Sequence, residues 1–273
     1  MKKTKVYLGI LSTGDRTDGQ VYRLNELRER YADEIEMVFP NDCVHYFGHD
    51  FARNTYVERF LESDCDVLWF LDSDVVPPQH IFDLITMHGD KWQVAGAPYP
   101  LWMPAQDGDM AVSLTAYNGV FKNEDGSPKS LKMAPVPSQG TEFVDGLATG
   151  CLFIKRDVFS QLEKPYFQFK RNPETMAVVE GEDLGFALKL SKLGIKFFVD
   201  YSMVCRHFKR VDLLEVNNYA ISFANNKLME YDRSIRSQIE AACKAAFIKG
   251  RESAMQQVRP QPRVTESGLI LPT

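Results

Sequence analysis

Long hydrophobic segments are missing from this chain of 273 residues. Residues 1–11 lack the extended apolar core of a signal peptide. No run approaches the roughly 20 apolar residues that a membrane-spanning helix needs. The hydrophobic fraction of 44% and the charged fraction of 25% are ordinary for a globular protein. The sequence therefore predicts a cytoplasmic protein with no transmembrane segment.

Cysteine is sparse, and its spacing excludes two kinds of small scaffold. The 5 cysteines are an odd number, lie far apart and include no C-x-x-C pair. This pattern is typical of reduced thiols in a cytosol and not of a disulfide framework or a zinc site. The set consists of Cys43, Cys65, Cys151, Cys205 and Cys243.

Two common phosphate-binding motifs are also absent. No G-x-G-x-x-G follows the first expected strand, and no P-loop lysine motif occurs.

The net charge of −5 argues against a dominant nucleic-acid surface. Residues 206–273 nevertheless hold 11 Lys and Arg against 7 Asp and Glu. A solvated helix surface or a phosphate-rich partner would explain this basic tail.

The strongest local pattern is an apolar run that ends in acidic residues, VLWFLDSD at 67–74. Five consecutive apolar residues predict a strand buried on both faces of a parallel sheet. Because side chains alternate along an extended chain, Asp72 and Asp74 are expected to point the same way and Ser73 the other. Two such carboxylates suit Mg²⁺ or Mn²⁺. A solvated turn is the alternative, since Asp, Ser and Pro are turn residues.

Strands and helices alternate around this run. We expect strands at 5–11, 35–39, 67–71 and 92–97, and helices at 20–31, 51–63 and 78–87. This alternation is the repeat of a parallel sheet with right-handed crossovers. It predicts an α/β fold, whose ligands lie at the carboxyl ends of the strands.

The second half of the chain is less regular. Residues 98–140 are rich in Pro, Gly, Asp and aromatic side chains, and short antiparallel strands are expected near 111–117, 131–136 and 142–147. The remaining expected elements are a buried strand at 148–154, a short helix capped by Asp157, a helix that begins near Glu182 and stops at Gly194, and a strand at 195–199.

Four short motifs follow one another in a particular order. Ala-Arg-Asn at 52–54 precedes Leu-Asp-Ser-Asp at 71–74, Thr-Gly-Cys at 149–151 comes next, Gly-Glu-Asp at 181–183 heads a helix, and His207 comes last. In this order they resemble a nucleotide-sugar glycosyltransferase of the GT-A fold. The first two motifs are similar to those of the large inverting family numbered 2.

The resemblance covers roughly residues 6–207 and implies a domain organisation. It implies a mostly parallel sheet flanked by helices, with a smaller antiparallel sheet on the acceptor side. Residues 1–207 would form the GT-A domain, with a nucleotide-binding half at 1–97 and an acceptor and catalytic half at 98–207. Residues 208–273 would be a helical C-terminal extension with a frayed end.

The resemblance also implies a metal site. Asp74 would bind Mn²⁺ or Mg²⁺ directly, Asp72 would contact the metal or the ribose, and His207 would be a further ligand. A diphosphate leaving group carries concentrated negative charge, so a cation beside it favours cleavage of the sugar–phosphate bond. A solvated surface histidine is the alternative interpretation of His207.

Catalytic and donor-binding roles are implied in the same way. Asp183 resembles the family's general base, which takes the proton of the acceptor hydroxyl, and Glu182 would hold the sugar or the acceptor. Acidic residues in a first helical turn also favour the helix dipole, which is the alternative. The nucleotide-sugar would be bound by Thr13, Asn41, Asp42, Arg53, Asn54, Asp72, Ser73 and Gly150. For Arg53 a solvated helix position is the alternative.

The expected activity is transfer of a sugar from a UDP- or GDP-type donor to a hydroxyl, with inversion. The acceptor stays open among a glycan, a protein side chain and a hydroxymethylated DNA base. Many family members carry an Arg/Gln-rich Trp motif near a membrane helix, and its absence here removes the processive synthases. Two alternatives stay open: a sugar-1-phosphate nucleotidyltransferase, of whose Gly-rich loop residues 12–16 supply a fragment, and a non-catalytic sugar- or nucleic-acid-binding module.

Overall fold

The computed structural model describes residues 2–12, 17–40, 48–104, 110–119, 132–135, 138–208, 225, 227, 229–241 and 244. The chain divides into two compact units, Met1–Lys209 and Arg210–Thr273. In the second unit, residues 229–241 are helical. None of the helices described is both long and apolar enough to cross a membrane. The three-part division expected from the sequence stays a prediction.

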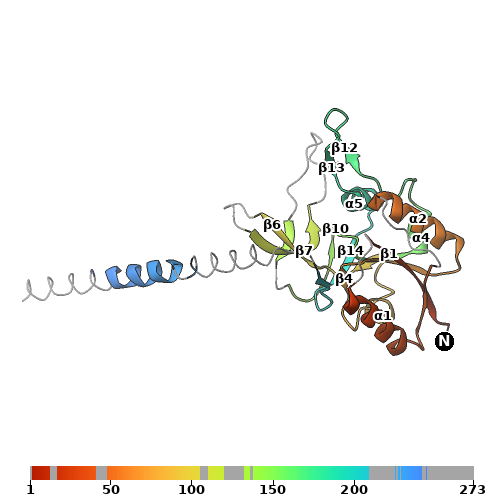
Figure 1. Cartoon of the computed structure of the whole chain (residues 1–273), viewed down its shortest axis with the longest axis horizontal. Helices are drawn as coiled ribbons and strands as arrows, with labels where there is room; N and C mark the ends of the chain where they lie inside the picture. The colour runs from red at the N-terminus through yellow and green to blue at the C-terminus, as the bar shows by residue number, and fades with distance from the viewer. Residues whose placement is uncertain are drawn as a thin grey trace, which may run out of the picture. The chain divides into compact units, whose positions relative to one another are not determined.

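The first unit is built on a seven-stranded sheet (Figure 1). Its strands, in spatial order, are β2 (Ile35–Val38), β1 (Thr4–Leu11), β3 (Val67–Asp72), β11 (Cys151–Lys155), β5 (Val94–Gly96), β14 (Phe197–Asp200) and β9 (Thr141–Val144). Five of these strands run in one direction, while β11 and β9 run in the other. The predicted fold class, α/β with a mostly parallel sheet, is confirmed.

Three longer helices pack against this sheet. They are α1 (Asp18–Arg30), α2 (His49–Glu62) and α5 (Glu182–Lys192). Figure 1 shows α1 on one side of the sheet and α2 with α5 on the other. Helix α1 begins at Thr17, whose hydroxyl accepts a hydrogen bond from the Gln20 amide. Helix α5 ends before Gly194, which has a φ of 72°.

The core lies around β3, whose residues Val67–Leu71 are all buried. The Trp69 ring stacks on Phe153 at a centroid distance of 5.1 Å, and Phe82 packs edge-on against both. Burial of each such side chain contributes roughly 1.5–3 kcal/mol. The end of β3 is therefore held in place by the best-packed part of the molecule.

The smaller strands form an antiparallel sheet and two ribbons. The sheet contains β10 (Gly146–Leu147), β7 (Met110–Asn118), β6 (Pro100–Pro104) and β8 (Lys132–Pro135). Strands were expected at the positions of β7 and β8, whereas β6 was not expected. The ribbons pair β12 (Lys170–Arg171) with β13 (Val178–Glu180), and β4 (Val75–Val76) with β15 (Arg206–His207). The second ribbon brings the end of this unit beside the acidic turn.

Several local expectations were wrong. The strand expected at 142–147 is divided, because β9 pairs with β14 and β10 pairs with β7. The helix expected at 78–87 is limited to α3 (Asp83–Thr86). The turns before it have hydrogen bonds between residues i and i+3, as in a 3₁₀-helix, and not the i to i+4 bonds of an α-helix. The short helix α4 (Arg156–Phe159) has Lys155 at its N-cap, and Asp157 lies in its first turn.

Candidate functional site

The acidic turn after β3 gives its two aspartates different partners. Residues 73–74 form a turn, so the alternation expected of an extended chain is broken. The Asp72 Oδ1 atom is 3.3 Å from Arg53 Nη2, whereas Asp74 Oδ2 is 3.4 Å from His207 Nε2. The turn is thus a junction between two groups of side chains.

A buried glutamine that sequence reasoning missed holds this turn in place. The Gln20 Nε2 atom donates to the carbonyl oxygens of Asp72 at 2.7 Å and Val75 at 2.8 Å. The side chain of Gln20 is fully buried. Its helical spacing from Leu24 and Leu27, which are also buried, was the signal that could have revealed it.

His207 is oriented toward Asp74 by its own surroundings. Its Nδ1 atom lies 2.9 Å from the carbonyl oxygen of Pro100, and because a carbonyl only accepts, Nδ1 carries a proton. The imidazole also packs against the Tyr99 ring at 4.6 Å. A protonated ring would donate from Nε2 to Asp74 Oδ2, whereas a neutral ring presents the lone pair of Nε2 to that oxygen. The second contact is favourable when a cation lies between the two atoms.

Asp74 and His207 therefore fit a divalent cation as a pair. Mg²⁺ and Mn²⁺ accept carboxylate and imidazole ligands and complete their shells with water and substrate phosphates. Within the ranges that the structure describes, no group of three or more His, Cys, Asp or Glu side chains is placed to hold a metal. The structure thus brings together two of the three expected ligands, and Asp72 turns to Arg53 instead.

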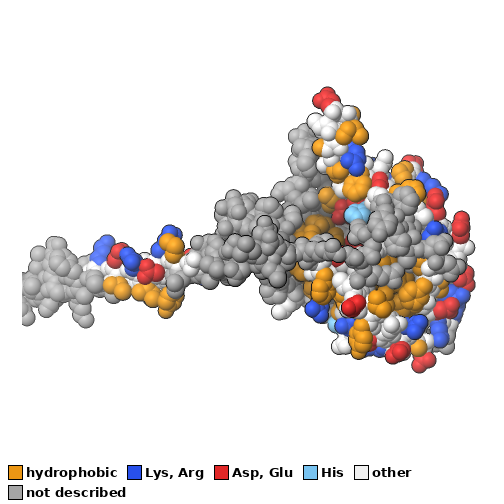
Figure 2. Space-filling view, in the orientation of Figure 1, with side chains coloured by type: hydrophobic (Ala, Val, Ile, Leu, Met, Phe, Trp, Pro, Cys, Tyr) orange, Lys and Arg blue, Asp and Glu red, His pale blue; other side chains and the backbone are white. Residues whose placement is uncertain are grey.

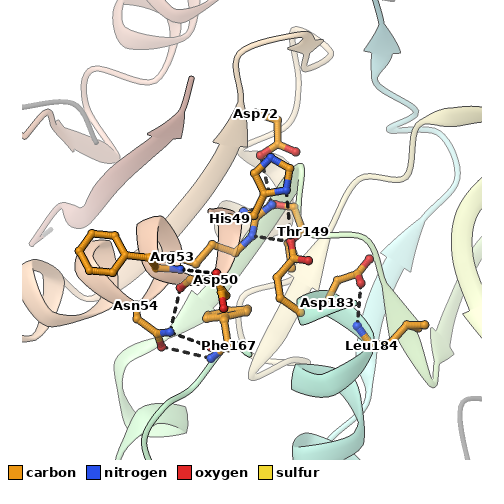
Figure 3. Close-up of polar contacts among 11 residues, drawn as sticks. His49, Asp50, Arg53, Asn54, Asp72, Thr149, Phe167, Asp183 and Leu184 are labelled. Atoms are coloured by element: carbon orange, nitrogen blue, oxygen red, sulfur yellow. Dashed lines mark hydrogen bonds and ion pairs between the residues drawn. The ribbon is translucent and has the colours of Figure 1, made fainter. Parts of the chain in front are cut away.

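Arg53 is the centre of the second group of side chains (Figure 3). Its guanidinium contacts Asp72 Oδ1 at 3.3 Å, Glu182 Oε1 at 3.4 Å and the Thr149 carbonyl oxygen at 3.4 Å. It also lies 5.2 Å from the centroid of the Phe70 ring. Burial alone would lower the pKa of Arg53, but the two carboxylates raise it.

The alternative of a solvated arginine is wrong, because Arg53 is 2% exposed. It lies on the apolar face of α2, at helical spacing from Tyr56, Val57 and Phe60, all of which are fully buried. A cation on that face can persist only with paired carboxylates. The spacing was therefore a signal that an acidic partner would come from elsewhere in the chain.

Asn54, the neighbour of Arg53, serves the backbone. Its Nδ2 donates to the carbonyl oxygens of Asp50 and Phe167, and its Oδ1 accepts from the amides of Tyr166 and Phe167. These bonds, some of them drawn in Figure 3, use nearly all the hydrogen-bonding capacity of the amide. The structure thus places Asn54 as a tether between α2 and the 166–167 segment.

The acidic pair at the start of α5 has two environments. The Glu182 carboxylate is 7% exposed and bonds to Arg53. The Asp183 Oδ1 atom accepts from the Leu184 amide at 2.8 Å. Burial, followed by the nearby charge of Glu182, raises the pKa of Asp183. A carboxyl group with a raised pKa is suited to proton transfer.

His49 and two tyrosines complete the surroundings of the acids. The exposed imidazole of His49 has its Nδ1 4.0 Å from Glu182 Oε1. Burial and then the charge of Asp183 raise the pKa of Tyr117. Burial and then the charge of Asp72 raise the pKa of Tyr99. None of the three was predicted, because an isolated residue at the start of a helix, in a loop or in a strand gives no spacing signal.

Gly150 allows two protein side chains to approach the backbone closely. A Cβ atom at this position would lie 2.7 Å from the Tyr99 ring and 2.9 Å from Asp72 Oδ2. The Gly150 carbonyl accepts from the Asp72 amide at 2.9 Å. Ser73 is buried, and its amide donates to the Leu11 carbonyl at 2.9 Å. Both residues therefore shape the end of β3.

The other predicted donor-binding residues, Thr13, Asn41 and Asp42, lie outside the described residues. Thr13 follows Ser12, which lies at the carboxyl end of β1. Asn41 and Asp42 lie in the segment that precedes Gly48, at the start of α2. The roles of the three residues stay predictions.

No family model matches the chain, and no curated protein matches it. Among solved structures, A197 from STIV has 19% identity and a TM-score of 0.47, over 76% of this chain and 86% of that one. GalNAc-T7, solved with UDP, GalNAc and Mn²⁺, has 12% identity and a TM-score of 0.44, over 77% of this chain and 44% of that one. The chain thus spans less than half the length of the second structure.

Proposed function

We propose that the protein is a metal-dependent glycosyltransferase, which moves a sugar from a nucleoside diphosphate donor to an acceptor hydroxyl. The observation that carries this proposal is the buried Arg53, whose guanidinium contacts both Asp72 at the end of β3 and Glu182 at the start of α5. Two acidic motifs that are far apart in the sequence are thereby joined in one site. Such a site has separate carboxylates for a cation and for proton transfer.

Asp74 and His207 are the proposed ligands of Mn²⁺ or Mg²⁺. A divalent ion held by these two side chains would supply positive charge beside a departing diphosphate. The contact of His207 with the Pro100 carbonyl fixes the ring, so that Nε2 is the ligating atom. Asp72, held by Arg53, is proposed to contact the ribose or the sugar.

Asp183 is the proposed general base. Its raised pKa makes the carboxylate a better proton acceptor than an ordinary aspartate. It would take the proton of the acceptor hydroxyl as the oxygen attacks the anomeric carbon from the face opposite the diphosphate. A single displacement of this kind inverts the configuration. Glu182, fixed by Arg53, is proposed to hold the acceptor or the sugar.

The donor is proposed to be of the UDP or GDP type, bound at the carboxyl edge of β1, β2 and β3. This edge carries Asp72, Ser73 and the turn at Gly150, and it is where open α/β sheets bind ligands. Thr13, Asn41 and Asp42 are proposed to reach the base and ribose, while Arg53 and Asn54 act through the side chain and backbone that they hold.

The test is incubation of the protein with a panel of UDP- and GDP-sugars and Mn²⁺. We expect slow release of nucleoside diphosphate from one donor, abolished by EDTA and by the variants Asp74→Asn and His207→Ala. The matched control His80→Ala, which removes an imidazole from the 78–82 turns, should keep the activity. Pyrophosphate formed from a sugar 1-phosphate and a nucleoside triphosphate would establish the nucleotidyltransferase instead. Silence with every donor would refute catalysis.

A further inference from the structure

A basic cavity lies beside α5, apart from the acidic groups described above. It has a volume of about 750 Å³ and is lined by α5, the β12–β13 hairpin and residues 168–169. Four cationic side chains line it, Lys170, Arg171, Lys189 and Lys192, against one carboxylate, Glu180. This local excess of positive charge contrasts with the net charge of −5 of the whole chain.

The four cations are not neutralised within the described part of the chain. None of them forms a salt bridge there, and the side chains of Lys170 and Lys192 form no hydrogen bond either. Arg171 Nη1 donates to the Met176 carbonyl at 3.1 Å, which leaves its other donors available. Lys189 donates to the Pro165 carbonyl, and burial lowers its pKa. Four cations against a single lining carboxylate, Glu180, are a local excess of positive charge that favours the binding of an anion.

The same hairpin exposes apolar side chains beside these cations. Met176 is 62% exposed, Val178 48% and Val179 59%. The ring of Phe169 lines the cavity, with the Arg171 guanidinium 5.9 Å from its centroid. Figure 1 shows β12 and β13 projecting beyond α5, and Figure 2 shows basic and apolar side chains together on this projection, with an acidic side chain at its tip. A ligand of this surface therefore combines anionic groups with apolar faces.

The cavity is close to the proposed base in the chain but lies on another face of α5. Strand β13 ends at Glu180, next to Gly181, which is the N-cap of α5. Helical periodicity turns Leu188 and Lys192, which line the cavity, away from Asp183. Because β13 leads from the cavity to the N-terminal end of α5, an extended ligand that follows this strand would approach Asp183.

We propose that this cavity and hairpin dock the phosphodiester backbone of a nucleic-acid acceptor. The inference rests on the proposed function, since it names the acceptor class. Nucleic acids alternate phosphates with apolar base faces, which matches cations beside exposed apolar residues. A two-stranded ribbon also fits a groove of duplex DNA. An acidic polysaccharide supplies the charge but offers hydroxylated rings in place of apolar bases.

The experiment measures binding of a fluorescently labelled oligodeoxynucleotide, single-stranded and duplex, to the full chain without donor or metal. The first variant, called the groove variant because it alters the cavity beside α5, combines Lys170→Ser, Arg171→Ser and Lys192→Ser. The control variant combines Lys2→Ser, Lys3→Ser and Lys91→Ser, which removes the same charge from exposed lysines elsewhere. We expect the groove variant to bind about tenfold or more weakly, and the slope of log K against log salt to fall by about 2.

The outcomes separate this inference from the proposed function. Equal weakening by the groove and control variants, or equally tight binding of an acidic polysaccharide to the unmodified protein, would overturn the docking site. Loss in the groove variant alone supports it, even if no donor is hydrolysed. Donor hydrolysis should persist in the groove variant, whereas Asp183→Asn should keep oligonucleotide binding. A second variant, Lys170→Glu with Lys192→Glu, should lose binding further while retaining the native circular dichroism spectrum.

Discussion

Replacing Arg53 by methionine should destabilise the protein strongly, because it leaves two carboxylates without their cation. The exposed side-chain fractions are 3% for Arg53, 9% for Glu182 and 26% for Asp72. Removing one partner of a buried ion pair costs about 3–5 kcal/mol. The contacts of 3.3 and 3.4 Å are longer than ideal charge-assisted bonds, and water reaches Asp72, so we expect about 3 kcal/mol. For a domain of this size, the melting temperature should fall by roughly 6–12 °C.

Urea unfolding followed by circular dichroism measures this loss. The control Arg28→Met makes the same change at an exposed position of α1 and should alter the free energy of unfolding by less than about 0.5 kcal/mol. Adding Glu182→Gln to Arg53→Met should restore about 1 kcal/mol, because one unpaired charge disappears. A loss below about 1 kcal/mol, or no recovery in the double variant, would show that Arg53 does not neutralise these carboxylates.

Four further predictions concern the site. Asp183→Asn should reduce transfer by about 10²–10⁴-fold. Because the pKa of Asp183 is raised in the folded protein, the same variant should stabilise the fold at neutral pH, and this gain should vanish below the ordinary aspartate pKa of 3.8, which denaturation at pH 7 and pH 3 checks. In the unmodified protein, the acid limb of kcat/KM should lie above pH 3.8, and a limb at or below that value would exclude Asp183 as the base. His207→Ala should weaken Mn²⁺ binding at least tenfold by titration calorimetry, and unchanged affinity would exclude it as a ligand. Gly150→Ala should lower the free energy of unfolding in urea by about 1–3 kcal/mol. The control Gly19→Ala, whose Cβ would meet its nearest atom at 3.7 Å, should not destabilise the protein. Equal effects of the two variants would contradict the crowding at Gly150.

The first half of the fold could be predicted from the sequence, because its periodicities are local. The strand at 67–71 has an uninterrupted apolar run, and the helices before it have apolar residues at helical spacing. The direction of β11 could not be predicted in this way. It lies between β3 and β5 and is antiparallel to both. Apolar content reports burial on both faces of a strand, but not which way the neighbouring strand runs.

The candidate site was predictable in its residue types and less so in its pairings. Asp74 and His207 were expected together, and β15 places them 3.4 Å apart. The partners of Asp72 were not expected, since an Asp-x-Asp turn gives no information about a guanidinium on α2. Gln20 was missed for a similar reason: its partners are backbone carbonyls of the turn. Such long-range pairings depend on how elements pack and not on local spacing.

The pairing with Arg53 also separates the roles of two adjacent carboxylates. Glu182 bonds to the Arg53 guanidinium, whereas Asp183 accepts from a backbone amide. Arg53 affects the pKa of Asp183 less than burial and the charge of Glu182 do. Burial, followed by the charge of Glu182, raises the pKa of Asp183, so this carboxylate binds a proton more readily than an ordinary aspartate. Glu182 is instead fixed in position by its bond to Arg53. This difference in environment supports the proposal that Asp183 is the base and Glu182 the positioning residue, an order that the first-turn position of both residues could not decide.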